Sequence, residues 1–171
     1  MNVSDYIMSF LVERGVDTAF CLTGWGAMGL DDSMMRIMKR YVCARNEAAA
    51  PVMAKAWAKL KNKPGLVIVT AGPGVSNAVA GVTECFVDSV PLIVLSGQVP
   101  TKDIVPGART FGTAGINAIE LVKPITKFAH LLIDVKSTKD IITHAYDMAM
   151  SNRPGPVWID IPLDLQTQSY G

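Results

Sequence analysis

Cysteine is scarce in this sequence of 171 residues, which contains Cys21, Cys43 and Cys85 and no other cysteine. An odd number of cysteines at wide, irregular spacing fits neither a disulfide framework nor a pair of metal-binding cysteines. A signal-peptide pattern is also missing, because Asp5 and Glu13 lie near the start and no basic segment precedes an apolar one. We therefore expect a cytoplasmic protein from a reducing compartment.

An excess of charge and long apolar runs are missing as well. The sequence has sixteen lysines and arginines and fifteen aspartates and glutamates, so its net charge is +1. This charge provides no excess of basic residues to bind nucleic acid or an anionic membrane. The longest apolar stretches, GLVIV and VPLIVL, are far shorter than the roughly 20 residues of a membrane span. We expect neither a nucleic-acid partner nor a membrane partner.

The composition that remains is that of an ordinary folded domain, with 50% hydrophobic and 18% charged residues. A chain of this length buries roughly 70% of its unfolded surface, so it needs neither disulfides nor a structural metal. No repeat, low-complexity tract or linker interrupts the sequence. We expect residues 1–171 to form a single domain.

Short apolar segments alternate with longer amphipathic ones, which predicts repeated β-α-β units. The predicted strands are residues 18–22, 40–44, 65–70, 91–96, 127–133 and 156–161. The predicted helices are residues 4–13, 27–38, 46–61, 75–88 and 138–151. Several of the strands are apolar on both faces, as a sheet covered by helices on each side requires. We expect a three-layer α/β/α fold with a mainly parallel sheet of about six strands.

In such sheets, ligands bind at the edge where the strands end. The loops expected there are TGWG (23–26), RNE (45–47) and AGPGVSN (71–77). The local sequence leaves two interpretations of Glu47: it caps the first turn of the helix that follows, or it serves chemistry. The glycine-rich loop makes a nucleotide-binding module an alternative function, although it lacks the Lys-Ser/Thr ending of a P-loop and the spacing of a dinucleotide fingerprint.

The remaining chemistry-bearing residues form no catalytic group in the sequence. His130 and His144 lie inside a predicted strand and a predicted helix with no nucleophile or second ligand nearby, so we interpret both as structural. No Ser-His-Asp grouping, metal cluster or nucleophilic cysteine is recognised. The residues by themselves therefore indicate no complete active site.

The order of the motifs is more specific than any one of them. It runs TGWGA, RNEAAAPVMAKAWAKLKNKPG, VIVTAGPGVSNAVAGVTECFVDSVPLIVLSGQV, LVKPITK and RPGPVWIDIPLDLQ. This succession resembles the N-terminal, pyrimidine-binding domain of thiamine-diphosphate enzymes of the acetolactate synthase type, and it covers residues 5–166. The resemblance implies part of a lyase, decarboxylase or carboligating transferase that acts on a 2-oxo acid.

The resemblance also implies the roles of individual residues. Glu47 matches the family's catalytic glutamate, which hydrogen-bonds N1′ of the aminopyrimidine ring and drives the ring toward the imino tautomer. The imino nitrogen then removes the C2 proton of the thiazolium. Such a carboxyl group must be held away from bulk water. Positions that bind thiamine diphosphate are implied for Thr23, Gly24, Gly72, Pro73 and Asn77.

The sequence departs from the family pattern at two places. Asn46 stands where most members have His before the glutamate, and Ala114-Gly115-Ile116-Asn117 stands where they carry Gln-Glu. Gln98 matches a position near the active-site and subunit boundary whose contacts differ between members. These departures leave the substrate open, and they make a degenerate, structural subunit a further alternative.

The second half of such an enzyme is missing from the sequence. Nothing resembles the Gly-Asp-Gly to Asn-Asn segment that holds Mg2+ and the diphosphate. The resemblance therefore implies a partner domain or subunit that binds the diphosphate, and this chain is either a split subunit or a fragment, inactive alone. An incomplete enzyme with an apolar partner face also predicts a homodimer or larger assembly. FAD, which some relatives bind in a middle domain, is assigned to no residue here.

Overall fold

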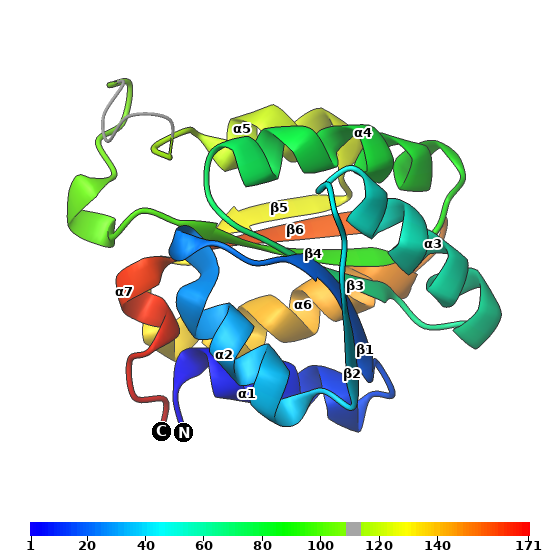
Figure 1. Cartoon of the computed structure of the whole chain (residues 1–171), viewed down its shortest axis with the longest axis horizontal. Helices are drawn as coiled ribbons and strands as arrows, with labels where there is room; N and C mark the ends of the chain where they lie inside the picture. The colour runs from blue at the N-terminus through cyan, green and yellow to red at the C-terminus, as the bar shows by residue number, and fades with distance from the viewer. Residues whose placement is uncertain (109–113) are drawn as a thin grey trace.

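A sheet of parallel strands occupies the centre of the molecule (Figure 1). The computed structural model describes residues 1–108 and 114–171. Its strands are β1 (Thr18–Leu22), β2 (Arg40–Cys43), β3 (Gly65–Val69), β4 (Leu92–Gln98), β5 (Phe128–Leu131) and β6 (Pro156–Pro162). They are ordered β2-β1-β3-β4-β6-β5, and each neighbouring pair is parallel. The expectation of a mainly parallel sheet of about six strands is confirmed.

Helices cover both faces of this sheet (Figure 1). One face carries α1 (Val3–Glu13), α2 (Met28–Ile37) and α6 (Thr138–Met150), and the other carries α3 (Ala49–Lys61), α4 (Pro73–Val87) and α5 (Ala118–Val122). A short helix, α7 (Leu163–Gln166), follows β6. Each face has its own apolar cluster between helices and sheet. The expected three-layer α/β/α fold is therefore confirmed.

Burial differs sharply between the central strands and one edge of the sheet. β3, β4 and β6 are buried along their whole length, which explains the apolar runs at residues 66–69, 92–95 and 156–159. All four residues of β2 are exposed, and within the described part of the chain β2 pairs with β1 alone. β2 is thus an open edge strand.

The structure corrects the start of one predicted helix and adds a helix that was not predicted. α3 begins at Ala49 rather than at residue 46, so Glu47 lies in the turn before the helix and not in its first turn. Asn46 causes this difference, because its Oδ1 accepts the Ala48 N–H at 2.8 Å and its carbonyl accepts the Ala49 N–H at 3.1 Å. The sequence also missed α5, a helix of five residues that is too short to show a period.

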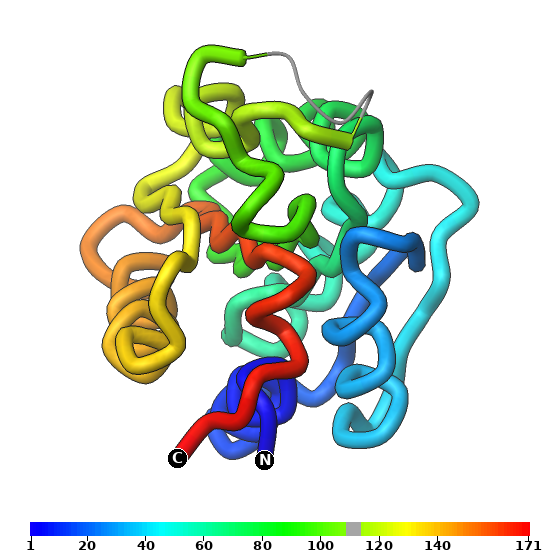
Figure 2. The backbone as a smooth tube through the Cα atoms, turned by 90° about the vertical axis from the view of Figure 1, so that its left-hand side faces the viewer, coloured from blue at the N-terminus to red at the C-terminus, as the bar shows by residue number. Residues whose placement is uncertain are grey.

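The two ends of the chain lie side by side (Figure 2). Asn2 and Ser169 form an antiparallel bridge, and the Tyr170 N–H donates to the Met1 carbonyl at 2.9 Å. Four short 3-10 turns complete the described structure, at Trp25–Ala27, Thr101–Asp103, Lys123–Ile125 and Val135–Ser137. Among the helices of the described residues, none has the length and apolar character that crossing a membrane requires.

Candidate functional site at the carboxyl edge of the sheet

The first three strands bring their following loops to the same edge of the sheet. The register pairs Cys21 of β1 with Cys43 of β2, and Leu22 of β1 with Val69 of β3. All three strands therefore end side by side. The loops at residues 23–26, 45–47 and 71–77 meet there, as the sequence predicted from the rule for parallel sheets.

Glu47 and Asn77 are in direct contact at this edge. Asn77 lies in the first turns of α4, and its Nδ2 donates a hydrogen bond of 3.1 Å to Oε2 of Glu47. Glu47 is half-buried, so this chain alone does not hold it away from bulk water as the resemblance implies, and Asn77 is exposed. Within the described residues this bond engages one carboxylate oxygen, and Oε1 is left for another donor. A half-buried carboxylate with one oxygen fixed is suited to bind a ring nitrogen that carries or accepts a proton.

The packing of α3 on α4 holds this pair together. Three buried alanines of α3, at positions 50, 54 and 58, face the apolar cluster that α4 shares. Lys55 of α3 reaches across to α4, with its Nζ 2.9 Å from Asp88 and 3.3 Å from Glu84. The helix that follows Glu47 and the helix that carries Asn77 are thus fixed relative to each other.

The turn after β1 packs closely against the end of β3. A Cβ atom at Gly24 would lie 2.6 Å from Cβ of Thr70, so no larger residue fits without movement. The Gly26 N–H donates to Oγ1 of Thr70 at 3.0 Å. Thr23 and Trp25 are exposed beside this turn. The absence of a side chain at position 24 therefore lets the turn after β1 pack directly on the end of β3.

The turn after β3 has a backbone that only glycine adopts readily. Gly72 has φ 64° and ψ −116°, in a region that L side chains seldom enter. Pro73 follows as the first residue of α4, where its missing N–H costs nothing. This turn directs α4 so that Asn77 reaches Glu47.

The structure adds one carboxyl group to this edge that the sequence did not reveal. Asp31 of α2 is 6% exposed, and its Oδ2 accepts the Gly24 N–H at 3.2 Å. Its Oδ1 has no hydrogen-bond partner among the residues that the structure describes. Burial raises the pKa of the Asp31 carboxyl to about 6, and the hydrogen bond from Gly24 opposes that rise. The signal in the sequence was an aspartate on the apolar stripe of a predicted helix.

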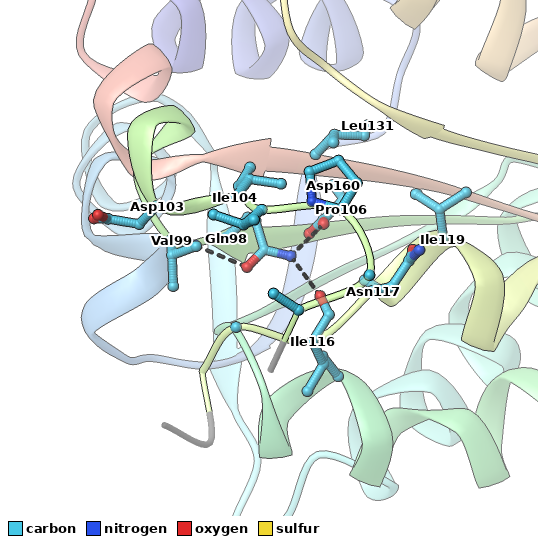
Figure 3. A pocket seen from close by; sticks show the side chains of 15 residues that line it. Gln98, Val99, Asp103, Ile104, Pro106, Ile116, Asn117, Ile119, Leu131 and Asp160 are labelled. Atoms are coloured by element: carbon cyan, nitrogen blue, oxygen red, sulfur yellow. Dashed lines mark hydrogen bonds between the residues drawn. The ribbon is translucent and has the colours of Figure 1, made fainter. Parts of the chain in front are cut away.

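A cavity of about 320 Å³ lies further along the same edge, beyond β4. Figure 3 shows Gln98 between Asp160 of β6 and the carbonyl of Ile116. Its Nε2 donates to both at 2.9 Å, and its Oε1 accepts the Val99 N–H at 2.9 Å. Gln98 is therefore fully hydrogen-bonded. It connects the sheet to residues 115–117, which line the cavity and belong to the segment that differs from the family pattern.

Asp160 is the centre of a buried polar network that the sequence did not predict. Ser96 donates to its Oδ1 at 2.5 Å, and Nε1 of Trp158 donates to the Ser96 hydroxyl at 2.7 Å. Burial raises the pKa of Asp160 to about 7, although the hydrogen bonds from Ser96 and Gln98 lower it. A single carboxyl within an otherwise apolar strand was the signal available in the sequence.

The two histidines lie away from the loops of the site. Phe128 packs against both, stacked on His130 with ring centroids 5.8 Å apart and edge-on to His144 at 4.8 Å. These contacts support the structural interpretation of both residues. Among residues 1–108 and 114–171, no three His, Cys, Asp or Glu side chains come together as metal ligands.

Comparison with known proteins shows which proteins this chain is similar to. The family model described as "Thiamine pyrophosphate enzyme, N-terminal TPP binding domain" matches residues 1–127. The chain is 37% identical over 166 residues to the chloroplastic acetolactate synthase of Arabidopsis thaliana. It is 37% identical to the acetolactate synthase large subunit of Lactococcus lactis and 33% identical to the acetolactate synthase isozyme 1 large subunit of Escherichia coli.

These alignments cover nearly all of this chain and a minor part of each relative. They include 96% of the chain for the Arabidopsis and Lactococcus proteins and 98% for the Escherichia protein. They include 24%, 28% and 29% of those relatives, respectively. The chain thus spans about a quarter of the length of the curated relatives it matches.

Proposed function

Because the chain belongs to the thiamine pyrophosphate enzymes as their N-terminal TPP-binding domain, we propose that its carboxyl edge binds the aminopyrimidine ring of thiamine diphosphate. The contact between Asn77 and Glu47 carries this proposal, since it holds a carboxylate at the meeting point of three loops. The chain would then supply the pyrimidine-binding half of an acetolactate synthase-like enzyme that acts on a 2-oxo acid such as pyruvate.

Glu47 is the proposed catalytic residue. Thiamine diphosphate supplies the carbanion chemistry when it is bound, and the protein supplies orientation and proton transfer. The carboxyl of Glu47 holds a proton at N1′ of the pyrimidine, while Asn77 keeps the carboxyl from rotating away. Asn46 sets the turn in which Glu47 lies, so the residue before the glutamate has a structural task in this chain.

The two glycine turns suit a flat ring that must approach the backbone closely. Thr23 and Gly24 bound the candidate site from β1, and Gly72 and Pro73 bound it from β3. Gly24 lets the turn after β1 pack on Thr70, and Gly72 gives the turn after β3 its positive φ. These residues are proposed to bind and orient the cofactor and to take no part in proton transfer.

The diphosphate end of the cofactor is proposed to bind outside this chain. The sequence contains nothing similar to the Gly-Asp-Gly to Asn-Asn segment that holds Mg2+ and the diphosphate in such enzymes. We assign the diphosphate and Mg2+ to a partner domain, on a longer polypeptide or a separate subunit, and expect the assembly to be a homodimer or larger. No residue of this chain is assigned to FAD.

Calorimetry combined with a turnover assay tests this function. Thiamine diphosphate with Mg2+ is titrated into the chain alone and into its mixture with a diphosphate-binding domain purified from an acetolactate synthase. We expect tight binding and pyruvate consumption in the mixture alone. Glu47→Gln should abolish turnover, whereas Glu13→Gln, which changes an exposed glutamate at the end of α1, should retain it. Equal turnover in the two variants, or no binding in the mixture, would contradict the proposal.

A further inference from the structure

Two of the three cysteines, which the sequence separates by 22 positions, lie together in the fold. Cys21 of β1 and Cys43 of β2 are paired in the register of the parallel strands, so their side chains leave the sheet on the same face. Their Sγ atoms are 3.6 Å apart. Neighbouring strands place paired Cα atoms about 4.8 Å apart, within the 4.4–6.8 Å that a disulfide spans.

The two thiols differ in their access to solvent. Cys21 is fully buried, whereas Cys43 is exposed on the open edge strand. The pKa of the Cys21 thiol is raised to about 12, by burial first and then by its contacts with Cys43 and the charge of Asp31. Cys21 therefore remains a protonated thiol, and a soluble oxidant meets Cys43 first.

The edge strand can supply the movement that a bond requires. The two sulfurs must approach from 3.6 Å to about 2.05 Å. β2 has four residues, all exposed, and pairs with one neighbour in the described structure. A small shift of this strand disturbs no buried core, because none of its side chains is buried.

We propose that Cys21 and Cys43 form a redox modification site, which hydrogen peroxide converts to an intramolecular disulfide and a dithiol reverses. The Cys43 thiolate attacks one peroxide oxygen, the O–O bond breaks, and a sulfenic acid and hydroxide form. The Cys21 sulfur then attacks the Cys43 sulfur, the S–O bond breaks, and water leaves with the Cys21 proton. Two thiols and one peroxide thus give one disulfide and two waters, with two electrons passing from sulfur to oxygen.

This bond would join the strands that lead into two loops of the candidate site. Cys21 lies two residues before Thr23, and Cys43 lies four residues before Glu47. Peroxide would therefore fix the separation of β1 and β2 at the edge where the loops meet. The sulfur chemistry does not depend on thiamine diphosphate, so it can be tested whether or not the proposed function holds.

Thiol counting by mass spectrometry tests the proposal on the 171-residue chain. The reduced protein is treated with hydrogen peroxide, quenched with catalase, unfolded and alkylated with N-ethylmaleimide. We expect one adduct in place of the three that reduced protein gives, and a tryptic product in which residues 15–36 are linked to residues 41–45. Dithiothreitol should restore all three adducts.

Variants calibrate the oxidation and exclude other pairings. Cys85 is buried in α4 and donates to the Pro51 carbonyl, so Cys85→Ala should keep the linked peptide. Cys43→Ser should lose it while its circular dichroism stays unchanged. The peroxide dose is set by dimedone labelling of Cys43 in Cys21→Ala. The proposal is overturned if, at that dose, Cys43 of the wild type remains a sulfenic acid while Cys21 still reacts with N-ethylmaleimide. It is also overturned if Cys43 forms a disulfide between two molecules.

Discussion

Asn77, in the first turns of α4, donates a hydrogen bond of 3.1 Å to the carboxylate of Glu47, which lies 30 positions earlier in the turn before α3. The two residues follow different strands, β3 and β2, and neither strand pairs with the other, since β1 lies between them. The contact therefore crosses the end of β1 at the carboxyl edge of the sheet. It places an oriented carboxylate where three loops meet.

Removing the amide should loosen Glu47 without unfolding the chain. For Asn77→Ala we predict a five- to tenfold loss of thiamine diphosphate affinity in the reconstituted mixture, because a hydrogen bond of this kind contributes about 1 kcal/mol. The free energy of unfolding should change by less than about 0.5 kcal/mol, since Asn77 is exposed. Ser76→Ala, one residue earlier and also exposed, is the matched control for calorimetry. Wild-type affinity in Asn77→Ala would show that Asn77 has no part in binding.

Asp160 should make stability depend on pH. Its pKa is raised by burial to about 7 in the folded protein, against about 3.9 in an unfolded chain. The folded state therefore holds the proton more tightly, so this contribution to stability is fully present below about pH 4 and is lost as pH rises to about 7. Asp160→Asn removes the titrating group, and its stability should fall less over that range than that of the wild type.

Urea unfolding at a series of pH values measures this difference. Asp31, whose pKa is raised to about 6, acts in the same direction over a narrower range and remains present in both proteins. Subtracting the two stability curves therefore isolates Asp160. An Asp31→Asn variant should alter the curve up to about pH 6 and leave the step up to pH 7 in place. Parallel curves for wild type and Asp160→Asn would show that Asp160 is ionised throughout.

A methyl group at Gly24 should destabilise the turn after β1. In Gly24→Ala the added carbon would lie 2.6 Å from Cβ of Thr70, and relieving such overpacking costs about 1–3 kcal/mol. The displaced turn should also lose its hydrogen bond to Asp31. Thermal unfolding measures the loss of stability. Calorimetry with thiamine diphosphate in the mixture measures how the displaced turn changes the affinity for the cofactor. An unchanged melting temperature would mean that the turn and β3 separate freely.

The strands and the layer architecture could be predicted because their signals are local. Residues 18–22 match β1 at both ends, since an apolar run between turn residues determines a strand without knowledge of its neighbours. The meeting of the three loops followed from the rule that parallel strands end at one edge. The catalytic interpretation of Glu47 came from the resemblance, because the local pattern is equally that of a helix cap.

Contacts that depend on the order of strands could not be predicted. The spacing of Cys21 and Cys43 indicates no pairing, and their proximity follows from the adjacency of β1 and β2 and from their register. Asp160 was missed for a related reason, since its partners Ser96 and Gln98 belong to β4, more than 60 positions earlier. Long-range register is a property of the whole sheet and not of any segment.

Proton exchange at C2 of thiamine diphosphate tests the central claim most directly, because it reports on Glu47 without requiring a substrate. The rate is measured by NMR in deuterated buffer, with the chain and a diphosphate-binding domain present. We predict that the wild-type mixture accelerates exchange over free cofactor by about 10²–10⁴-fold, as a positioned acid–base group does. Glu47→Gln should lose that acceleration, while Glu13→Gln, at the exposed end of α1, keeps it. Equal exchange rates in wild type and Glu47→Gln would contradict the account.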